Sequence, residues 1–389
     1  MKKLLFILPL LYYSCTDDIV SDIGSLQTEN QNLEAYIDSL NTVQQTLLED
    51  CAGVAGGTAT EDNCGVCDSD LTNNCVPDCA GVWGGDAVEN NCGICGGGGN
   101  SGCVLLWGVN YNIETTTSLN LSNNALSGQI SVQIGNLTNL TELNLHSNQL
   151  TGEIPVEIGN LTNLTYLDLG YNNLTGEIPL EIGNLTNLSS LGLYNNQLSG
   201  EIPSEIGDFT YLLYLNLSGN QLIGEIPLEI GNLVNLEYLF LSENNLSGEI
   251  PLEIGDLVNL EYLFLYENNL SGEIPIGIGS LTNLIYLNLS HNQIYGQIPS
   301  EIGNLIYLRE LRLSWNILTG QIPSEIGNLT NLEGLDLGGN YLTGQIPTEI
   351  GNLIDLEYLG LYYNSLTGHI PLEIGNLTDL WILDLTQNS

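Results

Sequence analysis

The sequence contains very few basic residues. Lysine and arginine together number four, against 46 aspartates and glutamates. Lys2 and Lys3 stand at the extreme N-terminus, which leaves only Arg309 and Arg312 for the rest of the chain. Nucleic acids need lysine and arginine to neutralise their phosphates, so we expect no nucleic-acid partner. The same shortage disfavours binding to an anionic membrane surface.

The sequence also lacks the groupings that catalysis or cofactor binding requires. Its three histidines, His146, His291 and His369, fall at different positions of the repeat described below. No Ser/His/Asp or Cys/His grouping and no glycine-rich phosphate loop occurs. We therefore expect a protein that is not an enzyme and that uses no cofactor and no dedicated metal site. His146 and His291 are expected at the rim of a binding surface.

Long apolar runs are absent except at the N-terminus. The opening MKKLLFILPLLYYSC has two lysines, an apolar run of about ten residues and a small residue before Cys15. This run is shorter than the ~20 residues of a membrane-spanning helix and is typical of a secretory signal. Its end resembles a bacterial lipoprotein signal, which implies that Cys15 is lipidated. An ordinary signal that leaves Cys15 spare is the alternative.

These features predict that residues 1–15 are a signal peptide and that the protein is exported. It would be an outer-membrane or cell-surface lipoprotein, or it would be secreted. Contact with a membrane is expected only through the N-terminal lipid.

Residues 16–50 carry a heptad pattern. One seam recurs every seven residues, at Ile19, Leu26, Leu33, Leu40 and Leu47. A second seam, offset by four, includes the polar residues Asn30 and Gln44. This pattern predicts a coiled-coil stalk and a homo-oligomer formed through the 16–50 helix. The alternative is a single amphipathic helix that is poorly ordered alone, because Gly24 weakens it.

Cysteine is absent after residue 103, and eight of the nine cysteines lie in residues 51–103. They form two copies of the spacing C-x12-C-x2-C-x7-C, at Cys51, Cys64, Cys67, Cys75 and at Cys79, Cys92, Cys95, Cys103. This glycine-rich segment has too little apolar mass for a core, so covalent bridges must stabilise it. An even cysteine cluster in an exported chain predicts disulfides, with zinc as the alternative. The connectivity stays open.

From Leu119 onward the chain repeats every 24 residues. Twelve L-x-L pairs run from 119/121 to 383/385, and an asparagine follows each pair, from Asn124 to Asn388. One repeat cannot bury its leucines alone, whereas stacked repeats bury them in one continuous core. One such layer is predicted to contain Leu140, Leu143, Leu145, Leu150, Ile154, Ile158 and Leu161.

Each part of the repeat has an expected structural role. Each L-x-L is predicted on a short parallel strand, with both leucines pointing inward. The asparagine amides are predicted to bond backbone groups of the adjoining coil. Pro155 and its equivalents fix an extended segment on the opposite edge.

The pattern L-x-x-L-x-L-x-x-N, with the added G-x-I-P-x-x-I-G, resembles the plant-type subclass of leucine-rich repeats. That subclass is known from plant receptor ectodomains and is also found in bacteria. The resemblance implies an α/β solenoid over residues 104–389, a curved superhelix with a parallel concave β-sheet. A coiled-coil helix and a small disulfide-rich module would precede it. The resemblance also implies recognition of a protein or glycan partner through the concave face.

Aromatic residues gather at the variable positions of the strands. The residue before each L-x-L is often tyrosine, and further aromatics follow nearby. The predicted binding residues are Tyr166, Tyr194, Tyr214, Tyr238, Phe240, Tyr262, Phe264, Tyr266, Tyr286, Arg312, Trp315, Tyr358 and Tyr362. Solvent-facing aromatics on a rigid curved sheet suit protein segments or sugar rings. The alternative is a structural or adhesive surface component, in which the tyrosines only stack and stabilise the sheet.

Arg309 and Arg312 flank Trp315 and are expected to anchor a carboxylate. Elsewhere, two columns of glutamates run through the repeats, one from Glu153 to Glu273 and one from Glu157 to Glu373. Because stacked like charges repel, salt or divalent cations are expected to stabilise the fold.

The two ends of the repeat array differ from its interior. The segment Trp107-Gly108-Val109 resembles the N-terminal cap of plant-type repeats but lacks the cysteine that usually follows. The sequence ends at LDLTQNS, midway through the twelfth repeat. Since terminal layers normally need a cap, we expect either a fragment or an edge that pairs with another molecule.

Overall fold

The computed structural model describes residues 31–39, 41, 54, 58–61, 67–68, 78–80, 82 and 102–389. The chain divides into two compact units, residues 1–99 and residues 100–389. Several predictions lie outside the described residues: the signal peptide with Cys15, and the bridges of Cys51, Cys64, Cys75, Cys92 and Cys95. They stay predictions.

In the first unit, residues 31–39 form a helix on which Leu33 and Ile37, one from each heptad seam, are exposed. Strands β1 (Thr60–Glu61) and β2 (Cys67–Asp68) pair antiparallel. Cys79, and Cys103 of the second unit, are each disulfide-bonded. In the described part of the chain, no helix is long and apolar enough to cross a bilayer.

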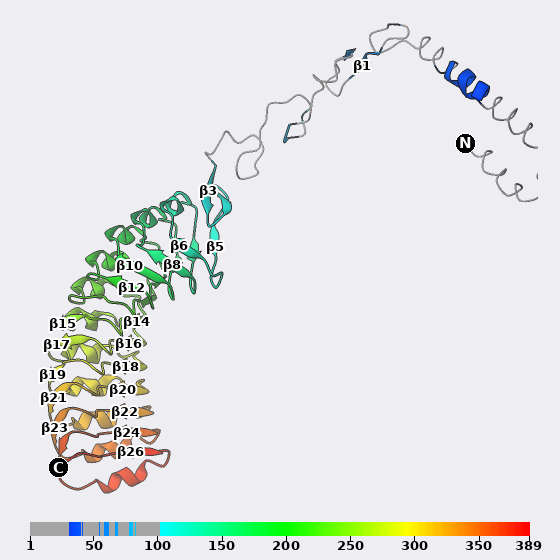
Figure 1. Cartoon of the computed structure of the whole chain (residues 1–389). Coiled ribbons are helices and arrows are strands. Elements are labelled where there is room, and N and C mark those ends of the chain that lie inside the picture. The colour runs from blue at the N-terminus through cyan, green and yellow to red at the C-terminus, as the bar shows by residue number, and fades with distance from the viewer. Residues whose placement is uncertain are drawn as a thin grey trace, which may run out of the picture. The chain divides into compact units, whose positions relative to one another are not determined.

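The repeats of the second unit stack as coils, and each coil contributes one strand to a twelve-stranded sheet. The strands follow one another in chain order and pair in parallel, with equivalent residues in register. They are β5 (Ser118–Asn120), β7 (Glu142–Asn144), β9 (Tyr166–Asp168), β11 (Ser190–Gly192), β13 (Tyr214–Asn216), β14 (Tyr238–Phe240), β16 (Tyr262–Phe264), β18 (Tyr286–Asn288), β20 (Glu310–Arg312), β22 (Gly334–Asp336), β24 (Tyr358–Gly360) and β26 (Ile382–Asp384). Figure 1 shows this sheet on the inner side of a curved stack.

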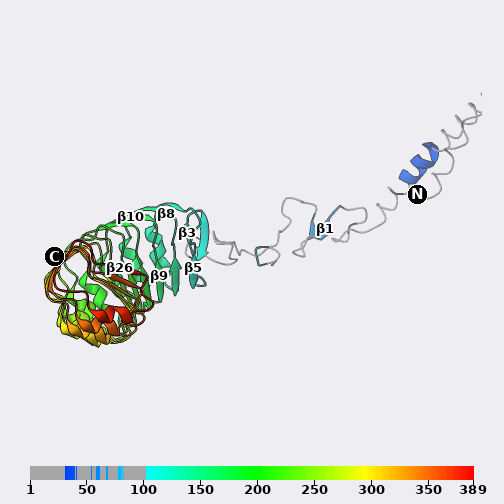
Figure 2. The same cartoon turned by 90° about the horizontal axis from the view of Figure 1, so that it is seen from below.

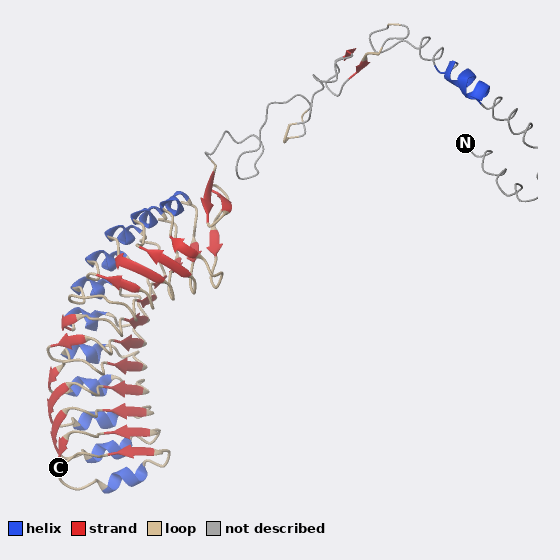
Figure 3. Cartoon of the chain, in the orientation of Figure 1, coloured by secondary structure: helices blue, strands red, loops and turns tan. Residues whose placement is uncertain are grey.

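The outer side of the arc carries 3₁₀ helices of five residues (Figure 3). They are η1 (Val132–Asn136), η2 (Val156–Asn160), η3 (Leu180–Asn184), η4 (Ser204–Asp208), η5 (Leu228–Asn232), η6 (Leu252–Asp256), η7 (Ile276–Ser280), η8 (Ser300–Asn304), η9 (Ser324–Asn328), η10 (Thr348–Asn352) and η11 (Leu372–Asn376). From η2 onward a proline in extended conformation precedes each one, as Pro155 does at φ −68°. The helical layer of the predicted α/β solenoid is therefore 3₁₀ in residues 102–389, because each segment between proline and the next coil is too short for an α-helix.

A second set of short parallel strands, which the sequence patterns did not predict, lies beside the 3₁₀ helices. One sheet contains β6 (Ser127–Gln129), β8 (Gln149–Gly152), β10 (Asn173–Glu177) and β12 (Gln197–Ser199). A second contains β15 (Ser247–Glu249) and β17 (Asn269–Ser271), and a third β19 (Tyr295–Gly296), β21 (Ile317–Gly320), β23 (Tyr341–Gly344) and β25 (Ser365–Leu366). In Figure 2 the coils turn progressively about the long axis, so the arc is also a superhelix.

The core confirms the predicted layer. Leu140, Leu143, Leu145, Leu150 and Leu161 are fully buried, and the two isoleucines of that layer are buried as well. The same positions are buried in nearly every coil, and Phe209 fills the place of a leucine in one of them. The apolar residues that every repeat shares therefore form the interior, and the positions that vary lie mostly outside it.

The asparagines bond the backbone of neighbouring coils, as predicted. Asn172 Nδ2 donates to the carbonyls of Leu145 and Leu169 at 3.0 Å, and its Oδ1 accepts from the Leu150 amide at 3.0 Å. Equivalent bonds recur along the arc through Asn388. Each asparagine thus satisfies backbone groups that the bend after the strand leaves without strand partners.

The N-terminal end of the arc is covered by a hairpin. Strands β3 (Cys103–Leu106) and β4 (Val109–Asn112) pair antiparallel around a turn in which Trp107 and Gly108 have φ of 46° and 83°. Val104 and Leu106 of this hairpin are buried in the core of the arc. At the other end the last coil leaves apolar side chains uncovered, including Leu383 at 40% exposure.

Candidate functional site on the concave sheet

The centre of the concave sheet carries a continuous ladder of aromatic rings. Tyr214, Tyr238, Tyr262 and Tyr286 are in register on four adjacent strands. Ring centroids of the last three are 4.9 Å apart in each adjacent pair, with interplanar angles of 21° and 15°. Their side chains are half-buried. In-register strands place equivalent side chains at the spacing of stacked rings, so repetition alone produces the ladder.

A second, shorter row runs beside the tyrosines. Phe240 and Phe264 lie in register with ring centroids 5.0 Å apart. Phe264 also approaches Tyr266, at a centroid distance of 6.2 Å. The ladder and this row together form one aromatic strip, which extends from Tyr214 to Tyr286.

The C-terminal end of the aromatic strip opens into a hollow of about 590 Å³. Phe264, Tyr266 and Tyr286 form one side of it, and His291, Trp315 and Tyr362 contribute to the other. Its remaining lining is Glu267, Leu287, Asn288, Ser290, Glu310, Arg312, Ser314 and Asp336. A concavity of this size, with aromatic walls and a few polar groups, has the character of a binding site for a small group or a protruding side chain.

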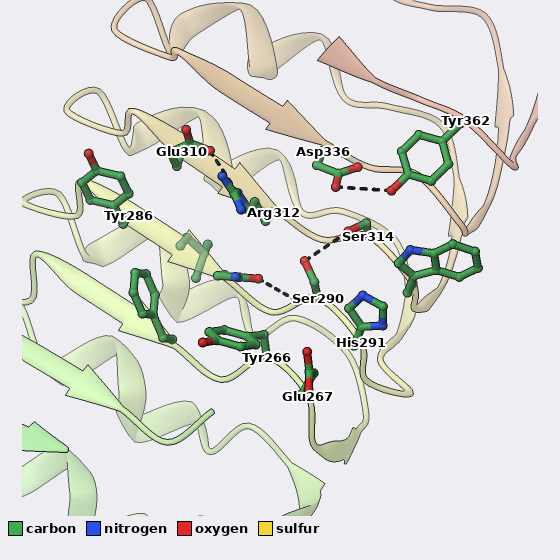
Figure 4. Close-up of a pocket in the computed structure, with 14 residues that line it drawn as sticks. Tyr266, Glu267, Tyr286, Ser290, His291, Glu310, Arg312, Ser314, Asp336 and Tyr362 are labelled. Atoms are coloured by element: carbon green, nitrogen blue, oxygen red, sulfur yellow. Dashed lines mark hydrogen bonds and ion pairs between the residues drawn. The ribbon is translucent and has the colours of Figure 1, made fainter. Parts of the chain in front are cut away.

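The polar groups of the hollow are connected to one another. Arg312 Nε donates to Glu310 Oε2 at 3.1 Å, and the Tyr362 hydroxyl donates to Asp336 Oδ2 at 3.4 Å (Figure 4). Burial, and then the charge of Asp336, raise the pKa of Tyr362, so its hydroxyl stays a donor at neutral pH.

The two arginines do not lie together. Arg309 pairs with Glu333 at 2.9 Å and is absent from the lining of the hollow. Arg312 does line it, but pairs with Glu310 within its own strand. Of the two arginines expected beside Trp315, only Arg312 lines the hollow with it.

Trp315 belongs to a column that the sequence analysis did not single out. The residue just before each asparagine has a left-handed backbone; Tyr171, His291, Trp315 and Tyr363 have φ between 52° and 55°. Glycine or asparagine suits this conformation, and other residues are held there at a cost of roughly 1–2 kcal/mol. Glycine does fill it at Gly219 and Gly339. The large rings in this column are therefore held in a conformation that the local backbone does not favour.

Trp315 contacts two other rings of this column, and it also contacts Tyr362. Trp315 stacks on His291 at 6.0 Å and lies 6.3 Å from Tyr362 and 6.0 Å from Tyr363. A Cβ added at Gly339 would lie 2.8 Å from the Trp315 ring. The Trp315 indole can therefore pack here only because residue 339 has no side chain.

A second aromatic cluster lies toward the N-terminal end of the sheet. His146 lies 5.3 Å from the Tyr171 ring and 3.2 Å, at Nδ1, from the Tyr194 hydroxyl. Nearby, the Tyr166 hydroxyl donates to Asp168 Oδ2 at 3.2 Å. Burial and the Asp168 carboxylate raise the pKa of Tyr166 to about 12, and the same causes raise that of Tyr194. This cluster is a hydrogen-bonded patch, separate from the hollow.

Apart from Tyr358, the structure distributes the predicted residues over three places. The hollow contains Phe264, Tyr266, Tyr286, Arg312, Trp315 and Tyr362. The rest of the aromatic strip contains Tyr214, Tyr238, Phe240 and Tyr262, and the N-terminal cluster contains Tyr166 and Tyr194. Burial of Tyr358, and then the charge of Asp336, raise the pKa of Tyr358 to about 12.

Several residues that line the hollow were not predicted from the sequence. Glu267, Ser290, Ser314 and Asp336 line the hollow but occupy positions where polar residues are common along the whole array. Aligning the repeats at the column before the asparagine would have drawn attention to Tyr171. Within the described residues, no cluster of histidine, cysteine, aspartate and glutamate has the geometry of a metal site.

Models of leucine-rich repeats match successive parts of the arc. A leucine-rich repeat region matches residues 208–340, a two-copy model residues 162–209, and a further model residues 114–174. Single repeats match residues 331–353 and 355–377. The chain belongs to the leucine-rich repeat family.

Solved structures with the same architecture come from bacteria and plants. A leucine-rich repeat protein of Leptospira interrogans is 43% identical, with a TM-score of 0.60 over 70% of this chain and 67% of that one. A TDR receptor is 37% identical, with a TM-score of 0.69 over 70% of this chain and 48% of that one. The ectodomain of the Arabidopsis receptor kinase HAESA, in complex with an IDA peptide hormone, is 37% identical, with a TM-score of 0.56 over 69% and 48%.

The chain thus spans about half the length of each of these two receptor chains. A search of curated protein sequences finds no match.

Proposed function

We propose that the chain is a binding protein that holds an extended segment of a protein partner on its concave sheet. The aromatic strip supplies a row of half-buried rings, and the hollow at its end supplies a place for one protruding side chain. Leucine-rich repeat solenoids use their concave surfaces for binding and are not known by their fold for catalysis. The single observation that carries the proposal is the continuity of the strip with the hollow.

The relatives support a protein segment over a glycan. The Arabidopsis receptor with 37% identity is in complex with a peptide hormone. An extended peptide fits a sheet of parallel strands because its side chains project at regular intervals onto successive coils. Sugar rings stack on isolated aromatic faces, whereas the faces of Tyr238 and Tyr262 are already stacked on each other.

A second candidate function is a structural or adhesive surface component with no specific ligand. The stacking of Tyr238, Tyr262 and Tyr286 favours it, because stacked rings also stabilise a sheet. Removing these rings distinguishes the two functions: a binding protein would lose its ligand and stay folded, whereas a structural component would lose stability.

A displayed random-peptide library, selected against the full chain, tests the proposal. The variant Tyr238→Ala, Tyr262→Ala, Tyr286→Ala is expected to fold and to lose the selected peptides. A matched control, Tyr295→Ala, Tyr307→Ala, Tyr341→Ala, removes three exposed tyrosines outside the concave sheet and should retain them. If no peptide is selected, or if both triple variants bind equally, the concave sheet is not the binding surface.

We also propose that this surface lies outside the cell. In this proposal the signal directs export, lipidation of Cys15 anchors the chain, and residues 16–50 and 51–103 form an oligomeric stalk and a disulfide-rich module. The plant relatives include a receptor ectodomain, which accords with export. Replacement Cys15→Ala should move the protein from the membrane fraction to the soluble fraction and abolish palmitate labelling; unchanged fractionation would contradict the anchor.

A further inference from the structure

The hollow has an excess of negative charge. Glu267, Glu310 and Asp336 line it together with Arg312, which is the one lysine or arginine among the lining residues. Arg312 is already paired with Glu310 at 3.1 Å, and the β-sheet register places it beside Asp336. Neither Glu267 nor Asp336 forms an ion pair within the described residues. A carboxylate ligand would meet two like charges here, whereas a cation would meet two opposite ones.

Both carboxylates retain capacity to accept hydrogen bonds. Asp336 accepts from the Gly338 amide at 3.1 Å and from the Tyr362 hydroxyl, and a carboxylate has further lone pairs. Glu267 is exposed at the rim, next to His291 in Figure 4. These two residues come from different coils, and Figure 4 shows them on opposite sides of Ser290 and Ser314.

A partly exposed tryptophan lines the hollow together with the two carboxylates. The Trp315 side chain is 46% exposed, so part of its indole is open to solvent in the hollow. His291 stacks on it, and the ring centroids of Tyr362 and Tyr363 lie 6.3 and 6.0 Å from that of the indole. The face of an indole attracts cations more strongly than any other aromatic side chain.

We propose that the hollow receives an arginine or lysine side chain of the bound segment, with its cation against the exposed part of Trp315 and hydrogen bonds to Asp336 and Glu267. The proposal rests on the proposed function and adds the chemistry of one ligand position. Planar guanidinium suits the site better than ammonium, because it stacks on indole while its edge donates to carboxylates. The net charge of −42 attracts basic segments from a distance, and the hollow selects the position at which one basic side chain is bound.

Three capped tripeptides that differ only in the central residue test this chemistry directly. Gly-Arg-Gly, Gly-citrulline-Gly and Gly-Glu-Gly are titrated into the full chain, with calorimetry and tryptophan fluorescence as readouts. Citrulline has the shape of arginine without its charge. The arginine peptide is expected to bind about tenfold or more tightly than the citrulline peptide, since both cation–π and charge-assisted hydrogen bonds need the charge. The glutamate peptide should not bind.

Variants locate the binding. Trp315→Leu, and the double variant Asp336→Asn with Glu267→Gln, are each expected to weaken the arginine peptide about tenfold. A matched control, Glu349→Gln with Glu373→Gln, removes the same charge from exposed residues of η10 and η11 and should change affinity less than about twofold. Asparagine at 336 still accepts from the Gly338 amide, so the fold is expected to persist, and circular dichroism checks it.

Several results would overturn the inference. They are the absence of arginine binding, equal affinity for arginine and citrulline peptides, tighter binding of the glutamate peptide at Arg312, or equal losses in the hollow and control variants. The proposed function stands or falls separately, because the peptide library can return neutral or acidic sequences that still require the aromatic strip. In that case the concave sheet binds protein segments and the hollow does not select a basic side chain.

Discussion

The asparagine after each strand shows how a single residue links two coils. Asn292 is buried; its Nδ2 donates to the carbonyls of Leu265 and Leu289, at 3.0 and 3.1 Å, and its Oδ1 accepts from the Leu270 amide at 3.0 Å. Alanine at this position would leave backbone groups buried without partners, since neither neighbouring coil offers a replacement.

We expect Asn292→Ala to lower the free energy of unfolding by about 1–3 kcal/mol for each group left unpaired, measured by urea unfolding. The matched control is Asn283→Ala in the same repeat. Asn283 is exposed, and its Nδ2 donates to the Val258 carbonyl at 2.9 Å, so water can replace this bond. Equal losses in the two variants would contradict a buried hydrogen-bonding role for Asn292.

The tyrosine hydroxyls give the fold a dependence on alkaline pH. Burial, followed by the charges of Asp168 and Asp336, raises the pKa of Tyr166 and of Tyr358 to about 12 in the folded protein. In the unfolded chain a tyrosine has a pKa of about 10. The unfolded chain therefore loses protons first, and the stability from these groups is complete below about pH 10 and is lost as the pH rises toward 12.

The double variant Tyr166→Phe, Tyr358→Phe should therefore unfold with a flatter dependence on pH between about 10 and 12, measured by urea midpoints. Tyr211→Phe with Tyr341→Phe, both strongly exposed, is the control and should retain the original slope. A slope that is the same in all three proteins would show that the two raised pKa values do not affect folding.

Residues that every repeat shares were predictable, and those that distinguish one repeat from another were only partly so. The asparagine bonds follow from the period alone, since one residue type recurs where the chain bends. The hollow depends on Gly339 leaving room for Trp315, and on Asp336 lying across the sheet from Arg312. Those are relations between coils 24 residues apart, which depend on side-chain orientation that spacing does not specify.

Among the elements, the 3₁₀ helix sets how closely the coils stack. The glycine of each EIG triplet faces the next coil. A Cβ added at Gly231 in η5 would lie 2.6 Å from Glu253 Cβ and 2.9 Å from its carbonyl oxygen. In η11, which has the same LEIGN sequence, a Cβ at Gly375 would meet nothing within 4 Å.

Alanine at these two glycines should therefore have different effects despite identical local sequence. Gly231→Ala is expected to destabilise the chain by about 1–3 kcal/mol, because the coils must separate to admit the methyl group. Gly375→Ala should be neutral or slightly stabilising, since alanine loses less backbone entropy on folding. Thermal unfolding measures both; equal effects would mean that local conformation, and not coil spacing, requires the glycine.

The strands and turns of the fold were predictable to different degrees. The twelve concave strands follow from the L-x-L pairs, whose apolar letters mark the buried face. The outer strands, such as β8 and β10, have few apolar residues of their own, and parallel backbone pairing between coils creates them. The hairpin of β3 and β4 joins residues outside the repeat, so the period carries no information about it.

At the scale of the whole molecule, the parallel stacking of coils that forms the core also aligns glutamate side chains in columns. Six glutamates, from Glu153 to Glu273, occupy one column, and each packs against the glycine of the next coil, as Glu177 packs on Gly200. Adjacent strands are ~4.8 Å apart, well within the Debye length of ~10 Å at 0.1 M salt. Further along, the same column changes to Gln297, Gln321 and Gln345, which pack on glycine in the same way without charge.

Salt should therefore raise the melting temperature of the chain, because it screens repulsion along the glutamate column while the packing is unchanged. Glutamine already occupies the column in later coils, so Glu177→Gln, Glu201→Gln, Glu225→Gln is a variant that the fold accommodates. This variant should melt higher than the original chain at low salt, with each adjacent like-charge pair removed contributing about 0.2–0.5 kcal/mol, and should gain less from added salt. Calorimetric scans from very low to sea-like salt measure both slopes, and a melting temperature that does not change with salt in either protein would show that charge repulsion does not limit the stability of the arc.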